Sequence, residues 1–195
     1  MTLQEILNEI LEKYPHPLSQ DNIIGKINTL LKEFFRTIYK PIVTTSYDLL
    51  ADNPYYPITY SPSKVIDIVV NGIEYDSLNI KGKASTNWYW FTDDNCIAVY
   101  PTPTEDVAGG LVVFRYKEPM VLSSSNLGAI PDFDHDFHML IVYRICKQLA
   151  ENYNEYDIAN GFVTQIDSLM DDFNKGKQEP DYRQVQDVYG GCMLL

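Results

Sequence analysis

The spacing of apolar residues changes twice along this chain of 195 residues, and these two changes constrain its fold more than any single motif. From residue 3 to residue 38, apolar residues recur every three or four positions, which is typical of amphipathic helices. Between about residues 42 and 118 the period falls to two and β-branched and aromatic residues become frequent, which indicates strands. The helical spacing returns at Asp132. We therefore predict an α+β fold, with N-terminal and C-terminal helix pairs around an inserted antiparallel β module.

The predicted domain boundaries follow these changes. Residues 1–40 and 130–173 form a helical core domain, because neither pair of helices can bury its apolar stripe alone. Residues 41–120 form the inserted β module. Residues 174–195 lose the periodicity but keep scattered apolar side chains, so we expect an extended C-terminal arm.

Local signals predict individual elements. Thr2 and Glu5 have the spacing of a capping box at the start of the first helix, which Pro15 ends. Asn71-Gly72 and Asp94-Asn95 lie between apolar runs and predict two hairpins. The other helices are expected over about residues 21–39, 132–151 and 155–173.

Charge and cysteine content exclude several classes of protein. The net charge is −12, from 27 acidic and 15 basic side chains, which opposes adsorption to DNA or to anionic lipid. No apolar run approaches the length of a membrane span, and the start of the chain does not resemble a signal peptide. Cys96, Cys146 and Cys192 are too widely spaced for a metal or redox motif and fit a reducing compartment.

The stretch DHDFH allows two interpretations. Three potential ligands for zinc or iron lie within one helical turn: His135, Asp136 and His138. Alternatively, Asp132 or Asp134 caps the start of a helix and the two histidines lie on its surface. The chain has only one other histidine, His16, in a Pro-flanked segment. This favours the helix start, and we predict no metal site, no cofactor and no catalytic residues.

Trp88 and Trp90 are expected on one side of a strand, where they could stack on a base or a sugar. Only Lys81 and Lys83 lie nearby to bind phosphate, so a role in the core or in subunit contacts is favoured. No phosphate-binding glycine motif and no hydrolase or metalloprotease motif is present.

The last predicted helix is strongly acidic on one side. Residues 151–173 carry six acidic groups and no basic one. At about 100° per residue, four aspartates share one face, which we call the acidic wedge: Asp157, Asp167, Asp171 and Asp172. The apolar residues predicted on the other side are Ile158, Phe162, Ile166, Leu169 and Phe173.

The order of several short motifs resembles a known group. These motifs are Tyr56-Pro57, the run from Lys64 through Asn71-Gly72, the run from Cys96 to Pro103, Leu111 to Tyr116, and Ile130-Pro131 before the long helix. Their arrangement over most of residues 20–173 is similar to head-tail connector proteins of tailed bacteriophages, also called adaptor or head-completion proteins.

The resemblance implies a structural virion protein that is not an enzyme. Members form a ring, commonly a dodecamer, under the portal; the ring extends the DNA channel and receives the tail. The implied partners are further copies of the chain, the portal protein and a tail or neck protein. DNA would pass without specific binding, and no membrane is involved. The implied location is the virion neck, with assembly in the host cytoplasm.

Two sets of residues acquire roles from this resemblance. The acidic wedge either lines the channel or is simply a solvated face. The C-terminal arm is expected to dock on the portal or another neighbour through its sparse side chains: Tyr182, Val185, Val188, Tyr189, Met193, Leu194 and Leu195. The alternatives are another neck or tail-completion ring, a metal-dependent enzyme using His135, Asp136 and His138, and a peptide-binding module.

Overall fold

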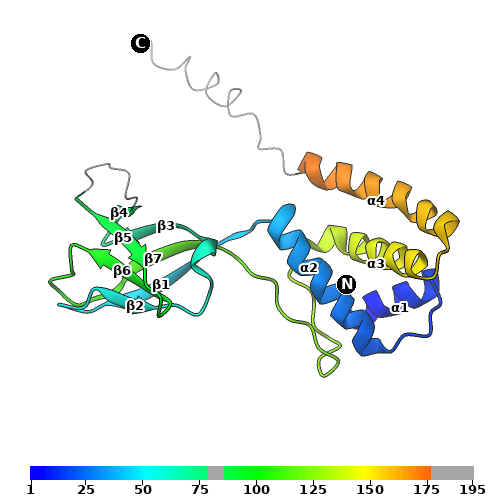
Figure 1. The fold of residues 1–195 in the computed structure, drawn as a ribbon, viewed down its shortest axis with the longest axis horizontal. Coiled ribbons are helices and arrows are strands. Elements are labelled where there is room, and N and C mark those ends of the chain that lie inside the picture. Colours follow the sequence, from blue (N-terminus) through cyan, green and yellow to red (C-terminus); the bar gives the residue numbers. More distant parts are fainter. Residues whose placement is uncertain (79–85, 177–195) are drawn as a thin grey trace, which may run out of the picture. The chain divides into compact units, whose positions relative to one another are not determined.

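The computed structural model describes residues 1–78 and 86–176 and contains two compact units (Figure 1). One unit consists of Met1–Lys32 and the segment that begins at Pro119, and the other is Glu33–Glu118. Helices build the first unit and a seven-stranded sheet builds the second, so the α+β prediction is confirmed. Among the described residues, no helix combines the length and apolarity of a membrane span.

The first unit is assembled around the apolar faces of its helices. The helices are α1 (Leu3–Lys13), α2 (Gln20–Thr37), α3 (His138–Asn152) and α4 (Tyr156–Gly176), with a 3-10 turn, η2 (His135–Phe137), before α3. The last residues of α2, from Glu33 on, belong to the second unit. α3 packs against both α1 and α4. Its side chains Leu140, Ile141 and Leu149 are fully buried, as are Ile6 and Ile10 of α1.

The predicted capping box at the start of α1 is confirmed. The hydroxyl of Thr2 accepts a hydrogen bond from the backbone N–H of Glu5, and the Glu5 carboxylate accepts one from the backbone N–H of Thr2. Two further backbone N–H groups of this turn donate to carbonyl groups far along the chain: Leu3 to Ala129 at 2.8 Å and Gln4 to Leu127 at 3.0 Å. The start of α1 is therefore fixed to the segment that precedes α3.

Seven strands form one sheet in the second unit. They are β1 (Ile42–Leu49), β2 (Tyr55–Pro57), β3 (Val65–Val70), β4 (Ile73–Ser77), β5 (Trp88–Phe91), β6 (Cys96–Tyr100) and β7 (Val107–Tyr116), with a 3-10 turn, η1 (Pro62–Lys64), before β3. Their order in the sheet is β1-β7-β3-β4-β5-β6-β2. Neighbours are antiparallel except β4 and β5, so the prediction of a purely antiparallel module is wrong for this pair. The segment between residues 77 and 88 is too long for a tight hairpin and lets β5 run in the same direction as β4.

Both predicted hairpins are confirmed. Asn71 and Gly72 join β3 to β4 with φ angles of 51° and 78°, the positive values that a two-residue type I′ turn requires. Asn95, with φ 58°, lies in the turn between β5 and β6, whose first paired residues are Phe91 and Ile97.

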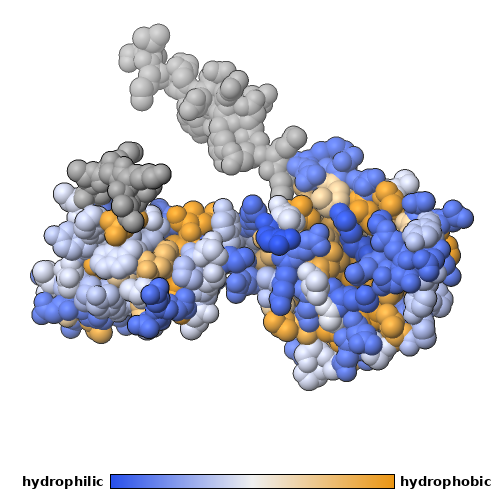
Figure 2. Space-filling view, in the orientation of Figure 1, coloured by the Kyte–Doolittle hydropathy of each residue, from blue (hydrophilic) through white to orange (hydrophobic). Residues whose placement is uncertain are grey.

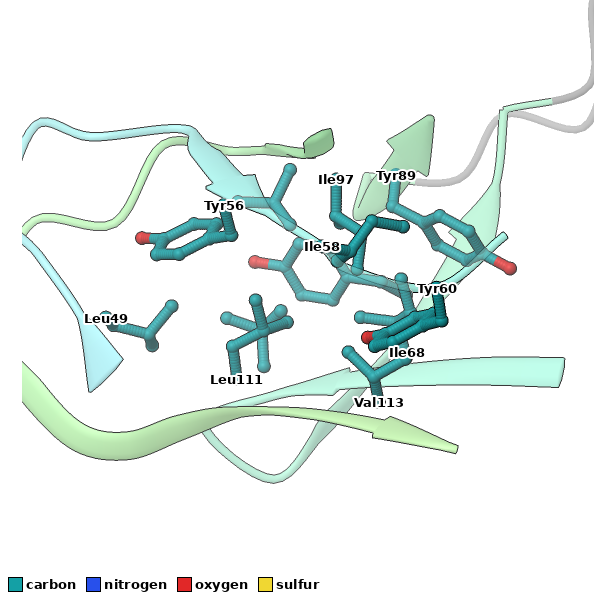
Figure 3. Packing of buried hydrophobic residues seen from close by; sticks show 12 residues of the cluster. Leu49, Tyr56, Ile58, Tyr60, Ile68, Tyr89, Ile97, Leu111 and Val113 are labelled. Carbon is teal, nitrogen blue, oxygen red and sulfur yellow. The ribbon is translucent and has the colours of Figure 1, made fainter. Parts of the chain in front are cut away.

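The sheet curls over a buried cluster of its own. Figure 3 shows side chains from distant strands facing one another across this cluster, with Tyr56 opposite Leu49 and Leu111. Tyrosine hydroxyl groups at its margin have polar partners: the Tyr47 hydroxyl donates to that of Tyr60 at 3.0 Å. The unit therefore has a core separate from that of the helices.

Candidate functional site

His138 is a buried histidine, which corrects the prediction that both histidines of DHDFH lie on the surface. Its side chain is 1% exposed. Its Nε2 lies 3.0 Å from the carbonyl oxygen of Phe133, and its Nδ1 lies 2.9 Å from the N-terminal nitrogen of Met1. The prediction fails because His138 contacts Phe133 and Met1, and the spacing of the two histidines does not indicate these contacts. His135 is exposed, and its ring stacks on that of His138 at 5.2 Å between centroids.

These contacts define the chemistry of His138. Nε2–H donates to Phe133, and Nδ1 accepts from the terminal ammonium group, so the ring is neutral. Burial lowers the pKa of His138; the positive N-terminus and His135 lower it further, while the hydrogen bond to Phe133 opposes the change.

The candidate metal ligands are not arranged for coordination. The one in-plane lone pair of the neutral His138 ring is on Nδ1 and accepts from Met1, so no lone pair is directed at a site shared with His135 and Asp136. Within residues 1–78 and 86–176, no three His, Cys, Asp or Glu side chains gather closely enough to hold a metal ion. Cys146 is buried in α3, and burial raises the pKa of its thiol to about 12, which keeps it protonated and unreactive.

Asp134 caps the helical segment, and Asp132 has a different role. An oxygen of Asp134 accepts from the backbone N–H of Asp136 at 3.2 Å. Asp132 instead accepts from the backbone N–H of Met120 at 2.9 Å and so holds the preceding segment. The α-helix itself begins at His138 and not at Asp132 as expected, because residues 135–137 adopt the tighter 3-10 turn.

The acidic wedge is a solvent-facing surface of α4. All four of its aspartates are exposed, and Asp172 forms an ion pair with Lys175 at 3.3 Å. The buried side of the helix is centred on Ala159, Ile166 and Phe173, which lie two turns apart. Ile158, predicted on the side opposite the wedge, lies at the edge of the buried side and is 47% exposed.

Contacts at both ends of α4 fix the direction of the wedge. Near the end of the helix, Phe173 stacks on Phe133 and meets the edge of Phe137, with centroids 5.5 Å and 5.0 Å away. Just before its start, Glu155 accepts a 2.6 Å hydrogen bond from the hydroxyl of Tyr14. Burial of the opposite side against α3 therefore holds the carboxylates toward solvent.

The two tryptophans lie on the outer side of the sheet. Tyr89, between them in β5, belongs to the buried cluster, so Trp88 and Trp90 point away from it, as the spacing predicts. Trp88 contacts Tyr100 at 5.3 Å between ring centroids, and Tyr100 is itself 52% exposed. Lys81 and Lys83, the only cations expected nearby, lie outside the described residues. The surface is aromatic and suits a protein contact better than phosphate binding.

The predicted docking residues of the C-terminal arm, from Tyr182 to Leu195, lie outside the described residues.

Comparison with known families identifies the group to which the chain belongs. The family model of the SU10 adaptor protein matches residues 1–188, almost the whole chain. The chain is a member of the SU10 adaptor family. The resemblance to phage adaptor proteins is thereby confirmed. A search of curated proteins finds no match.

Membership in the SU10 adaptor family indicates which kind of molecule the exposed surfaces contact. The family consists of phage adaptor proteins, which are structural components of virions that interact with other head or tail proteins. Hydrophobic residues interrupt the hydrophilic surface of both units of this family member (Figure 2). Such patches are a feature of surfaces that other proteins cover.

One feature of this SU10 adaptor family member escapes prediction from sequence, and a second has a signal that the predictions above did not use. The contact between His138 and Met1 joins residues 137 positions apart, and no local pattern indicates it. The outward apolar residues of β3 and β7 do have a signal: both strands contain apolar residues at successive positions, IVV at 68–70 and LVVF at 111–114, instead of alternating.

Proposed function

We propose that this protein is a head-tail connector whose copies form a ring, commonly a dodecamer, under the portal. The ring extends the DNA channel and provides the attachment site of the tail. The observation that carries this proposal is the match to the SU10 adaptor family over residues 1–188. In the virion the protein would lie in the neck, after assembly in the host cytoplasm.

In this proposal the acidic wedge faces the channel. Asp157, Asp167, Asp171 and Asp172 are exposed on a helix whose other side is fixed in the core. Carboxylates facing a duplex repel its phosphates, whereas Lys and Arg would hold the duplex through release of counterions. An acidic lining therefore favours passage over binding, and it is consistent with the net charge of −12.

The C-terminal arm, residues 174–195, is proposed to dock on the portal. Its apolar side chains are too sparse for a core of their own and suit pockets on a neighbouring protein. A chain that ends at residue 176 retains α4 and all described contacts, so a loss of docking by this chain would not be caused by a loss of folding.

The proposal is tested by adding the purified chain to purified portal rings and imaging the mixture by negative stain. The expected result is a second ring stacked on the portal. This second ring should not form when the chain that ends at residue 176 is added, and it should not be seen with the portal alone or with the chain alone at low concentration. Binding only to isolated tails would indicate a tail-completion ring. A chain that stays monomeric with both partners would contradict a connector of either kind.

The metal-dependent enzyme has no comparable support, because His138 has both ring nitrogens engaged. A peptide-binding module is likewise not favoured by any described surface, whereas the family match favours an assembly protein.

A further inference from the structure

The outward side of β3, β4 and β7 forms a continuous surface, which we call the outer sheet face. It consists of three apolar residues and three carboxylates: Val69, Val112, Phe114, Asp67, Glu74 and Asp76. The strand register makes these residues neighbours. Val69 pairs with both Val112 and Glu74, and Phe114 pairs with Asp67. Leu111 and Val113, which alternate with them along β7, are fully buried on the other side of the sheet.

The apolar half of this face is unusual for a surface in contact with water. An antiparallel sheet with one solvated side normally alternates apolar and polar residues. In β7, however, Leu111, Val112, Val113 and Phe114 are apolar in succession. Val69, Val112 and Phe114 are half-buried within the chain. Strands that are apolar on both sides are typical of sheets covered on both sides, so a covering protein would remove the remaining exposed surface of these residues from water.

The charges on the face indicate what covers it. Arg115 is the only Lys or Arg in β1, β3, β4 and β7, and it points inward. Its guanidinium lies 4.3 Å from the centre of the Tyr60 ring, and its Nε donates to Thr45. The three carboxylates therefore have no cation beside them in these strands, and a covering surface of opposite charge would complement them.

The chain carries such a basic surface at the end of α2. Lys32 and Arg36 are exposed one turn apart, and Lys40 follows the helix end and is also exposed. Glu33 is the only acidic residue between Lys32 and Lys40. Within the described residues, none of the three cations forms an ion pair.

We propose that the outer sheet face of one copy binds the basic end of α2 of an adjacent copy. The inference rests on the proposed ring and names the two surfaces that meet in it. Because the two surfaces differ, the contact is head-to-tail, and a head-to-tail contact closes into a ring when the rotation between copies allows it. One interface of this kind, repeated, uses both surfaces of every copy.

Charge reversal tests this pairing. The sheet variant carries Glu74→Lys and Asp76→Lys, and the helix variant carries Lys32→Glu and Arg36→Glu; all four positions are exposed, so folding should persist. Each variant alone brings like charges together at every interface, and we expect the ring-bound fraction on portal to fall roughly tenfold or more. The loss should shrink at about 0.5 M salt, where such charges are screened.

Mixing the two variants distinguishes contacts between copies from contacts within one copy. In an alternating ring every interface of the mixture is complementary again, so assembly should recover. A chain with all four reversals should also recover, whatever the copy number. Recovery of the fourfold variant but not of the mixture would mean either that the pairing lies inside one chain or that the ring has an odd number of copies. Cross-linking a mixture of labelled and unlabelled fourfold variant decides between these. A link from the Glu74→Lys position of one copy to the Lys32→Glu position of a copy with the other label shows pairing between copies.

A matched control accounts for net charge. Glu12→Lys with Glu105→Lys changes the charge by the same amount as the sheet variant, at exposed positions outside both surfaces, and should assemble like the parent chain. Normal assembly of both the sheet and the helix variants would overturn the inference while leaving the connector function intact. Failure of the parent chain to bind portal would contradict the connector function itself, and a Glu74–Lys32 cross-link between copies in solution would still test the pairing.

Discussion

The ring of Phe173, near the end of α4, stacks on the ring of Phe133, which precedes α3, with their centroids 5.5 Å apart. Both side chains are almost completely buried, at 2% and 1% exposed. The contact ties the end of a surface helix to the segment that carries Asp134 and His138. It therefore couples the stability of the helical unit to the position of the acidic wedge on the opposite side of α4.

Replacing Phe173 by alanine should destabilise the helical unit. Removal of a buried phenylalanine leaves a cavity and typically costs about 3–5 kcal/mol in the free energy of unfolding. Urea denaturation followed by circular dichroism measures this change. Asn174→Ala, at the next and exposed position, serves as the control and should change the stability by less than about 0.5 kcal/mol. Equal effects of the two substitutions would mean that the end of α4 does not belong to the core.

Removal of the cap at Asp134 should have a smaller and chemically specific effect. Asp134→Ala loses the hydrogen bond to the N–H of Asp136 and should cost about 0.5–2 kcal/mol. Asp134→Asn keeps an oxygen that can accept this bond and should retain most of the stability. If asparagine and alanine proved equally destabilising in urea denaturation, the side-chain cap would not be the cause.

The buried His138 should make stability depend on pH. Its pKa in the folded protein is lowered from the ordinary value of 6.5, mainly by burial, so near and below pH 6.5 the unfolded chain binds the proton more readily. The resulting stability is fully present above pH 6.5 and is lost as the pH falls toward the lowered pKa.

This dependence is measured as the free energy of unfolding in urea between pH 7.5 and pH 5.5. His138→Gln has no titrating ring, so its stability should fall less over this interval, even if it is lower throughout. His135→Gln changes an exposed ring and removes only a minor cause of the lowered pKa of His138, so it should retain most of the slope of the parent chain. The same slope in His138→Gln and in the parent chain would show that other groups cause the dependence.

Much of the fold could be predicted because its signals are local. The helical period defines α1, α2 and α4 to within a few residues, and Thr2, Glu5 and Asn71-Gly72 act through neighbours in sequence. The parallel pairing of β4 with β5 has no such signal, because the hairpin rules describe only strands joined by short turns.

The candidate site was less predictable, because the burial and orientation of its residues depend on tertiary contacts. The pattern DHDFH correctly indicated a helix start, but the burial of His138 depends on Phe133 and on Met1, which no local rule brings together. Ile158 was assigned to the apolar side from its angle, yet packing against α3 covers a narrower arc centred on Ile166. Which partner meets each exposed surface is a property of the assembly and not of one chain.

The acidic wedge yields a prediction about DNA passage. If it lines the channel, replacing Asp167, Asp171 and Asp172 by lysine places cations beside the moving phosphates, and ejection of DNA from assembled particles should slow. The effect should be largest at low salt, since at 0.1 M charges more than about 10 Å apart across water are already largely screened. Replacement of the same residues by asparagine removes the repulsion without adding attraction and should slow ejection much less. All three positions are exposed, so folding and ring docking should persist and can be checked by thermal melting and negative stain. Ejection at the parent rate by the lysine variant at low salt would mean that the wedge is a solvated face away from the channel.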